Sequence, residues 1–132
     1  MDVRVQDFEN ILSFQTTIRW DANLLGTAIV RQFGIPNLGI SNFNATQAGI
    51  LRIGWDDPTF EGISLVRNQR IFQVCFDVPD SAAGSSTIEF TNNPIPTEII
   101  DVNGNEVSPN FTNGSVNISC DNDPTNLSLI HI

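Results

Sequence analysis

The stretch ILSFQTTIRWDANLL, from Ile11 to Leu25, decides the fold, and its first ten residues alternate strictly between two sides. One side carries Leu12, Phe14, Thr16, Ile18 and Trp20, and the other carries Ile11, Ser13, Gln15, Thr17 and Arg19. A period of two is typical of a β-strand with one buried face. We therefore predict a strand whose first set faces the core, with Thr16 as its polar member. WDANLL then breaks the alternation and predicts a turn capped by Asp21.

The same period recurs along most of the chain. It appears in DVRVQ, LLGTAIV, AGILRIGW, IFQVCFDV, STIEF, TEIIDV and GSVNIS, each bounded by Gly, Pro, Asn or Asp. These bounding residues are typical of turns, and no segment shows a helical period of useful length. The sequence therefore predicts seven to nine short strands arranged as an all-β sandwich or barrel.

Two Asn-Gly pairs predict tight turns. Asn103-Gly104 lies between two extended segments, as in a type I′ hairpin, and Asn113-Gly114 predicts a second turn of that kind. The first pair also lies among oxygen-bearing side chains that could bind calcium: Asp101, Asn103, Asn105 and Glu106. The full twelve-residue calcium-loop pattern is missing, so the hairpin is the favoured interpretation.

Composition limits the possible functions. The 132 residues suffice for one domain with a core of its own, and their net charge is -9. There is no Lys, and the six Arg are scattered, which argues against nucleic acid and anionic membranes as partners. The sequence contains no run of about 18 apolar residues, so no transmembrane helix is predicted. Its start, MDVRVQDFEN, lacks the apolar segment of a signal peptide.

An enzyme is not predicted. The single histidine, His131, allows no Ser-His or Cys-His pair and no histidine-based metal cluster. Two carboxylate pairs remain, Asp56 with Asp57 and Asp121 with Asp123. Two carboxylates can hydrolyse a glycosidic bond, but adjacent acids before a proline are more typical of a turn.

Cys75 and Cys120 are the only cysteines. Two are too few for a disulfide scaffold, and their spacing is not that of a metal site. They could pair in an oxidising compartment, although free thiols are the favoured interpretation.

Trp20 and Trp55 allow two interpretations. On an exposed sheet face such rings stack on sugars or anchor a protein interface. Both rings, however, alternate in register with apolar neighbours. That pattern favours burial in the core.

In several segments the sequence resembles the cohesin family, whose β-sandwich modules bind dockerin domains in cellulosomes and related surface assemblies. The resemblance runs from about Asp2 to Ser119. It is carried, in this order, by NILSFQTTIRWDANLL, GILRIGWDDP, GISLVRNQRIFQVCFDV, STIEFTNNPIPTEIIDVNGNEV and TNGSVNIS. It implies a nine-stranded jelly-roll sandwich of two sheets, a non-catalytic role, and no cofactor, since the calcium is bound by the dockerin.

The same resemblance sets the expected domain organisation. Residues 1–120 would form the cohesin-like domain and residues 121–132 a linker or tail, with LSLIHI at 127–132 foreign to the family. The first strand would be truncated. The chain would then be a fragment of a larger secreted bacterial protein, extracellular or on the cell surface, in a cellulosome-like assembly for polysaccharide degradation.

In cohesins one sheet presents a flat face to the helices of the dockerin. The matching positions here are Ser13, Gln15, Thr17, Arg52, Gly54, Asp57 and Gln73, with Cys75 beside them. Ser13 and Gln15 replace an Asn and an Asp of the family pattern, which distinguishes this face from that of standard cellulosomal cohesins.

Two other hypotheses compete with dockerin binding. A carbohydrate-binding module of the same architecture would expose Trp55, Trp20 or Phe60 in a planar strip and bind polysaccharide. A spacer domain of a large adhesin would bind no ligand, and its sheet face would only be solvated.

Overall fold

The chain folds into short strands with very little helix. The computed structural model describes residues 1–80, 82–118 and the backbone of residues 130–131. Within this part the elements are β1 (Asp2–Val5), β2 (Ile11–Arg19), β3 (Ala28–Arg31), η1 (Ile40–Asn42), β4 (Phe43–Asn44), β5 (Ile50–Asp56), β6 (Gln69–Phe76), β7 (Gly84–Thr91), β8 (Glu98–Asp101), β9 (Gly114–Ile118) and β10 (Ile130–His131). No helix in these residues has the length and apolar content needed to span a bilayer.

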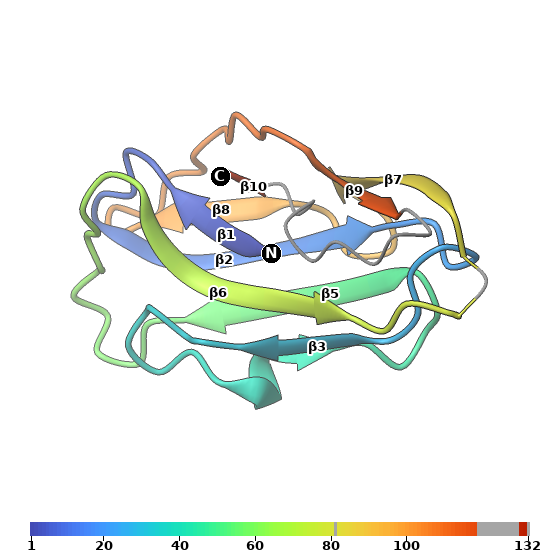
Figure 1. Ribbon diagram of the computed structural model, residues 1–132. Coiled ribbons are helices and arrows are strands. Elements are labelled where there is room, and N and C mark those ends of the chain that lie inside the picture. The colour runs from blue at the N-terminus through green and yellow to red at the C-terminus, as the bar shows by residue number, and fades with distance from the viewer. Residues whose placement is uncertain (81, 119–129, 132) are drawn as a thin grey trace.

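The strands form two sheets packed face to face, as Figure 1 shows. The four-stranded sheet has the order β10-β1-β6-β3. The six-stranded sheet has the order β4-β5-β2-β7-β9, and β8 also pairs with β2. The predicted all-β sandwich is therefore confirmed.

Strand β2 lies in the middle of the six-stranded sheet. One edge pairs with β5 from Ser13↔Asp56 to Arg19↔Ile50. The other edge pairs first with β8, from Ile11 to Gln15, and then with β7, from Thr17 to Arg19. A central strand with partners on both edges has its register, and so the side each residue faces, strongly fixed.

The predicted inner side of β2 is confirmed for Phe14, Thr16 and Ile18, which are all buried, as is Trp20 just after the strand. The prediction is wrong at the start of the strand, where Ile11 is buried and Leu12 is only half-buried. The pairing with β8 shifts register between Ile11 and Ser13. Such a bulge adds one residue to one strand and exchanges the sides on which its neighbours lie.

Aromatic side chains fill much of the core between the sheets. The rings of Phe8, Phe14 and Trp55 form one group, with centroids 5.6 to 6.4 Å apart. Trp20 packs against Phe76 with the two centroids 5.0 Å apart. The buried indole N–H of Trp55 donates to the carbonyl of Pro36, 3.0 Å away, so the ring enters the core without an unsatisfied donor.

Of the first two turn predictions, the cap at Asp21 is confirmed and the type I′ geometry at Asn103-Gly104 is wrong. The backbone N–H groups of Asn23, Leu24 and Leu25 all donate to Asp21, so its predicted role as a cap is confirmed. Asn103-Gly104 does lie in a turn, but a type I′ turn needs positive φ at both residues, and of this pair only Gly104 has it.

Two predictions remain, a calcium loop that includes Asp101 and a second tight turn at Asn113-Gly114. The Asp101 carboxylate accepts the N–H groups of Asn103 and Asn105, so this side chain holds the turn itself. No group of three or more His, Cys, Asp or Glu side chains in the described residues could hold a metal ion. The second predicted turn is wrong, because Gly114 begins β9 and pairs with Ile88.

A second acidic turn follows β5. Asp57 is buried, and its carboxylate accepts the Thr59 N–H at 2.9 Å, the Thr59 hydroxyl at 2.8 Å and the Gly62 N–H at 2.8 Å. The backbone N–H of Thr59 is the main cause that lowers the pKa of Asp57 below its ordinary value of 3.8. The preference of an acid before proline for a turn is thus realised at Asp57.

The predicted tail, residues 121–132, lies almost wholly outside the described residues, together with Cys120. Cys75 forms no disulfide in the described part of the chain. The backbone of β10 pairs in parallel with β1 at Val3 and Arg4.

Phe14 offers a direct test of the inner face of β2. It is 5% exposed and contacts two other aromatic rings, so Phe14→Ala removes a large buried side chain. We expect a loss of about 3–5 kcal/mol in the free energy of unfolding, measured by urea denaturation. Gln15→Ala, one residue further on the opposite face, is the control and should cost well under half as much. Equal losses at both positions would contradict the assignment of faces.

Asp57 predicts a specific dependence of stability on pH. A carboxyl whose pKa is lower in the folded than in the unfolded state stabilises the fold above the unfolded value, and this contribution is lost as pH falls through the folded value. We therefore expect Asp57→Asn to lower the free energy of unfolding at pH 7, and the deficit to shrink as pH falls below about 4. Urea titrations between pH 7 and 3 measure this. Asp56→Asn, at an exposed neighbour, is the control, and an equal pH response in both variants would contradict the role of Asp57.

Candidate functional site

Four of the predicted binding residues lie together on the outer face of the six-stranded sheet, the face turned away from the other sheet. Ser13 and Gln15 come from β2, and Arg52 and Gly54 from β5. Gln15 is directly opposite Gly54, and Thr17 is opposite Arg52. On the far side of β5, Asn44 of β4 is opposite Arg52. Alternate residues of three neighbouring strands therefore form one surface.

This surface is hollowed around Gly54, in a cavity of about 410 Å³ that we call the Gly54 depression. Its lining residues are Gln15, Ser41, Asn42, Phe43, Asn44, Arg52, Ile53, Gly54 and Ile95. A Cβ atom added at Gly54 would meet no heavy atom within 4 Å. The missing side chain of Gly54 thus opens the floor of the depression.

Hydrogen bonds hold the polar walls of the depression in place. The Asn42 side-chain amide donates to the Gly54 carbonyl at 2.9 Å and accepts the Gly39 N–H at 2.9 Å. The Gln15 amide donates to the Pro96 carbonyl at 3.1 Å. The Arg52 guanidinium donates to the Gln47 side chain at 2.8 Å. Because these side chains are already positioned, little conformational entropy would be lost when a partner binds them.

Thr17 was predicted on the exposed face, and this prediction is wrong. Its side chain points outward but is completely buried, because the segment after β7 crosses over it. The Thr17 hydroxyl donates to the Ile95 carbonyl at 2.9 Å and accepts the Ile95 N–H at 3.0 Å. Ile95, rather than Thr17, therefore contributes to the surface here.

Asp57 was also predicted on this face, and the structure contradicts this. It is 2% exposed, and its carboxylate is directed into the turn that ends at Gly62. The carboxylate that does reach solvent is its neighbour Asp56, opposite Ser13. The two acids thus have separate environments and do not act as a carboxylate pair.

Gln73 and Cys75 were expected beside the other face residues, but they lie on the opposite side of the sandwich. Both belong to β6, in the four-stranded sheet. There the Gln73 side chain accepts from Arg31 at 2.8 Å and donates to Asp2 at 3.0 Å, and Asp2 also pairs with Arg4 at 2.8 Å. Gln73 therefore belongs to a polar network on the outer face of the other sheet.

The residues that sequence reasoning missed come from the segment between β3 and β5 and from the loop after β7. Asn42 and Asn44 lie in η1 and β4, which are too short to show any period in the sequence. Phe43 between them packs its ring against Phe72 at 5.0 Å, and this inward anchor places the two asparagines on the outer side. A short polar-aromatic-polar pattern was the available signal.

The residues proposed for sugar stacking are not arranged for it. Trp55 is 1% and Trp20 is 8% exposed, so neither indole face is available to a sugar. Phe60 is 78% exposed, in the turn after β5. The favoured assignment of both tryptophans to the core is therefore confirmed, and the exposure that a carbohydrate-binding module would require is not found at either ring.

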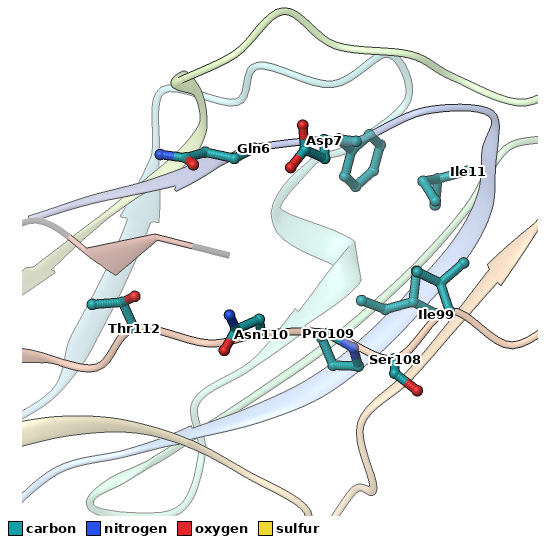
Figure 2. A pocket seen from close by; sticks show the side chains of 10 residues that line it. Gln6, Asp7, Ile11, Ile99, Ser108, Pro109, Asn110 and Thr112 are labelled. Carbon is teal, nitrogen blue, oxygen red and sulfur yellow. The ribbon is translucent and has the colours of Figure 1, made fainter.

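A second hollow lies at the edge of the sandwich and is shown in Figure 2. It has a volume of about 400 Å³ and separates the connection between β1 and β2 from the connection between β8 and β9. Gln6 and Asp7 form one wall, and Pro109 and Asn110 form the other. It shares no lining residue with the Gly54 depression.

Comparisons with known proteins bear on the fold. No protein-family model and no curated protein matches the sequence. Among solved structures, the seventh type I cohesin of ScaB from Pseudobacteroides cellulosolvens is similar, with a TM-score of 0.70, 18% identity, and coverage of 92% of this chain and 79% of that one. So is a chain of the Coh-OlpA-Doc918 cohesin–dockerin complex from Clostridium thermocellum, with a TM-score of 0.69, 23% identity, and coverage of 86% and 83%.

An archaeal protein provides a third comparison. The non-cellulosomal cohesin from the archaeon Archaeoglobus fulgidus has a TM-score of 0.60 and 19% identity, over 93% of this chain and 72% of that one. At such low identities the likeness concerns the arrangement of the strands rather than individual residues. The chain therefore has the fold of a cohesin domain.

Proposed function

We propose that this chain is a non-catalytic interaction module of the cohesin type that binds a dockerin-like helical module. The binding surface is the outer face of the six-stranded sheet around the Gly54 depression. The observation that carries the proposal is this depression of about 410 Å³ in the outer sheet face, with polar walls already held by hydrogen bonds. A hollow of this size accepts one or two side chains from an opposing helix.

The chemistry of the surface suits a protein partner. Interfaces between soluble proteins combine a small apolar centre with a polar rim. Here Ile95 supplies apolar contact, and Ser13, Gln15 and Asn44 supply hydrogen-bonding groups. Most of these polar side chains are short, and several are already fixed, so ordering them costs little.

The solved structures of similar fold support a dockerin-like partner. They include cohesin–dockerin complexes, such as the sixth cohesin of Acetivibrio cellulolyticus scaffoldin B with a dockerin. We further propose that the module belongs to a larger extracellular or cell-surface protein, in an assembly that degrades polysaccharide.

We do not propose carbohydrate binding. Stacking on sugars needs exposed aromatic faces, and both indole rings lie in the core. Trp55 is further fixed there by its hydrogen bond to Pro36. Phe60 alone provides no planar strip.

The proposal predicts that Gln15→Arg abolishes dockerin binding and leaves folding intact. The new side chain would project from the outer face at the wall of the depression, where it clashes with a docked helix. A panel of recombinant, calcium-loaded dockerin modules is screened by isothermal titration calorimetry, first on the natural domain and then on the variant. Circular dichroism and thermal unfolding report the fold.

Gln6→Arg is the matched control, since Gln6 is an exposed glutamine that lines the separate hollow of Figure 2. We expect it to leave dockerin binding unchanged. Loss of binding in Gln6→Arg but not in Gln15→Arg would move the interface to that hollow. Unfolding of Gln15→Arg would mean that the two faces of β2 are assigned the wrong way round. Absence of binding across the whole panel would contradict the proposed function.

A further inference from the structure

The Gly54 depression differs in charge from the protein around it. The chain carries 15 acidic residues against six Arg, for a net charge of -9. None of the residues that line the depression is acidic, and one of them is Arg52. A cationic hollow therefore lies in the face of a strongly acidic domain.

No acidic side chain among the described residues forms an ion pair with Arg52. The ion pairs formed by the described residues join Arg4 and Arg70 to Asp2, on the other sheet. Arg52 donates to Gln47, which is neutral, and its Nε is buried without a partner among the described residues. The rest of the side chain is half-buried, and removing its remaining water without supplying a charge partner would be costly. A partner that covers Arg52 must therefore bring a negative group to it.

The surroundings of Arg52 would strengthen that pairing. Ile95 also lines the depression, and its apolar side chain lowers the local polarity once water is excluded. Gly54, two residues along the same strand, leaves room for an incoming side chain beside the guanidinium. Guanidinium and carboxylate groups form two parallel hydrogen bonds when they approach in one plane.

Acids of the same face lie on both sides of the depression, and Glu89 of β7, which is opposite Arg19, lies toward the Arg52 end. Asp56 follows Gly54 by two residues on β5, on the side away from Arg52, and Glu98 of β8 is opposite Gln15. Neither lines the depression. The Arg52 end of the face thus carries Arg52, Arg19 and Glu89, and the other end carries Asp56 and Glu98. The charge becomes more negative from the first end to the second, which favours one orientation of a charged partner over the reverse.

We infer that the Gly54 depression receives an Asp or Glu side chain of the helical partner, and that this carboxylate pairs with Arg52 and so determines which partners bind. The inference rests on the proposed function, because it assumes that a helical module docks on this face. It adds the chemical identity of the partner side chain that enters the depression.

A display selection tests the inference without a known natural partner. The probe is a library built on one calcium-loaded dockerin module, with the exposed positions of its helices randomised. The library is selected on the natural domain, on Arg52→Glu, and on Arg31→Glu as the control on the other sheet. We expect Asp or Glu to be enriched at least fivefold at one position on the natural domain and on Arg31→Glu. On Arg52→Glu the same position should instead favour Lys or Arg.

Affinities of one selected binder complete the test. Arg52→Gln should weaken the affinity of this binder at least tenfold. The loss of affinity should be smaller for Arg52→Lys and larger for Arg52→Glu. Reversing the charge of the selected acid in the binder should restore binding to Arg52→Glu. Thermal unfolding shows whether each variant is folded, and Arg52→Lys, which keeps the positive charge, remains informative if Arg52→Glu is not.

The outcomes separate the two proposals. Binders that are lost with Gln15→Arg but show no acidic enrichment, or that bind Arg52→Gln and the natural domain equally, would overturn the inference and leave the proposed function standing. Binders that are indifferent to Gln15→Arg, or a selection that yields none on the natural domain, would overturn the proposed function and the inference with it.

Discussion

The structure depends on the way both edges of β2 are bonded. One edge is occupied by β5 along seven residue pairs, while the other is divided between β8 and β7. Where one partner ends and the other begins, the Thr17 hydroxyl both accepts the Ile95 N–H and donates to the Ile95 carbonyl. Buried backbone groups need partners, and here a side chain provides them at the point where the sheet changes neighbours.

The core packing of β2 determines which of its residues face outward to the candidate site. Phe14 and Ile18 hold the inner side of β2 against the other sheet, so Ser13 and Gln15 must face outward. A slip of one residue would exchange the two sides and expose the aromatic group. The segment that Thr17 binds also places Ile95 at the wall of the Gly54 depression. The register of one strand and the shape of the candidate site therefore have the same cause.

The sequence predicted the features that depend on local periodicity. Alternation identified the strands and assigned Phe14, Ile18, Trp20 and Trp55 to the core, because each strand has one buried face. It failed at Leu12, where a bulge adds a residue to the strand, since a bulge leaves no mark in the period.

The failures within the candidate site have a different origin. Gln73 alternates as an outward residue should, but alternation does not tell which of the two sheets a strand joins. Thr17 is likewise outward, yet it is covered by a segment 78 residues further along the chain. Both errors concern contacts between distant parts of the sequence. Such contacts depend on the order of strands in the sheets, which the period of a single strand does not contain.

The net charge of the domain and the single charge of Arg52 act over different distances, and they need not favour the same partner. The net charge of -9 acts over about one Debye length, roughly 8 Å at physiological ionic strength, and attracts basic molecules. Arg52 acts only at contact, because it is a single half-buried charge in a depression of a strongly acidic domain. Under the proposed pairing, a partner that is basic overall but carries one acid on its docking helix satisfies both. The acidic surface then governs how fast the partner arrives, and Arg52 governs how long the correct one stays.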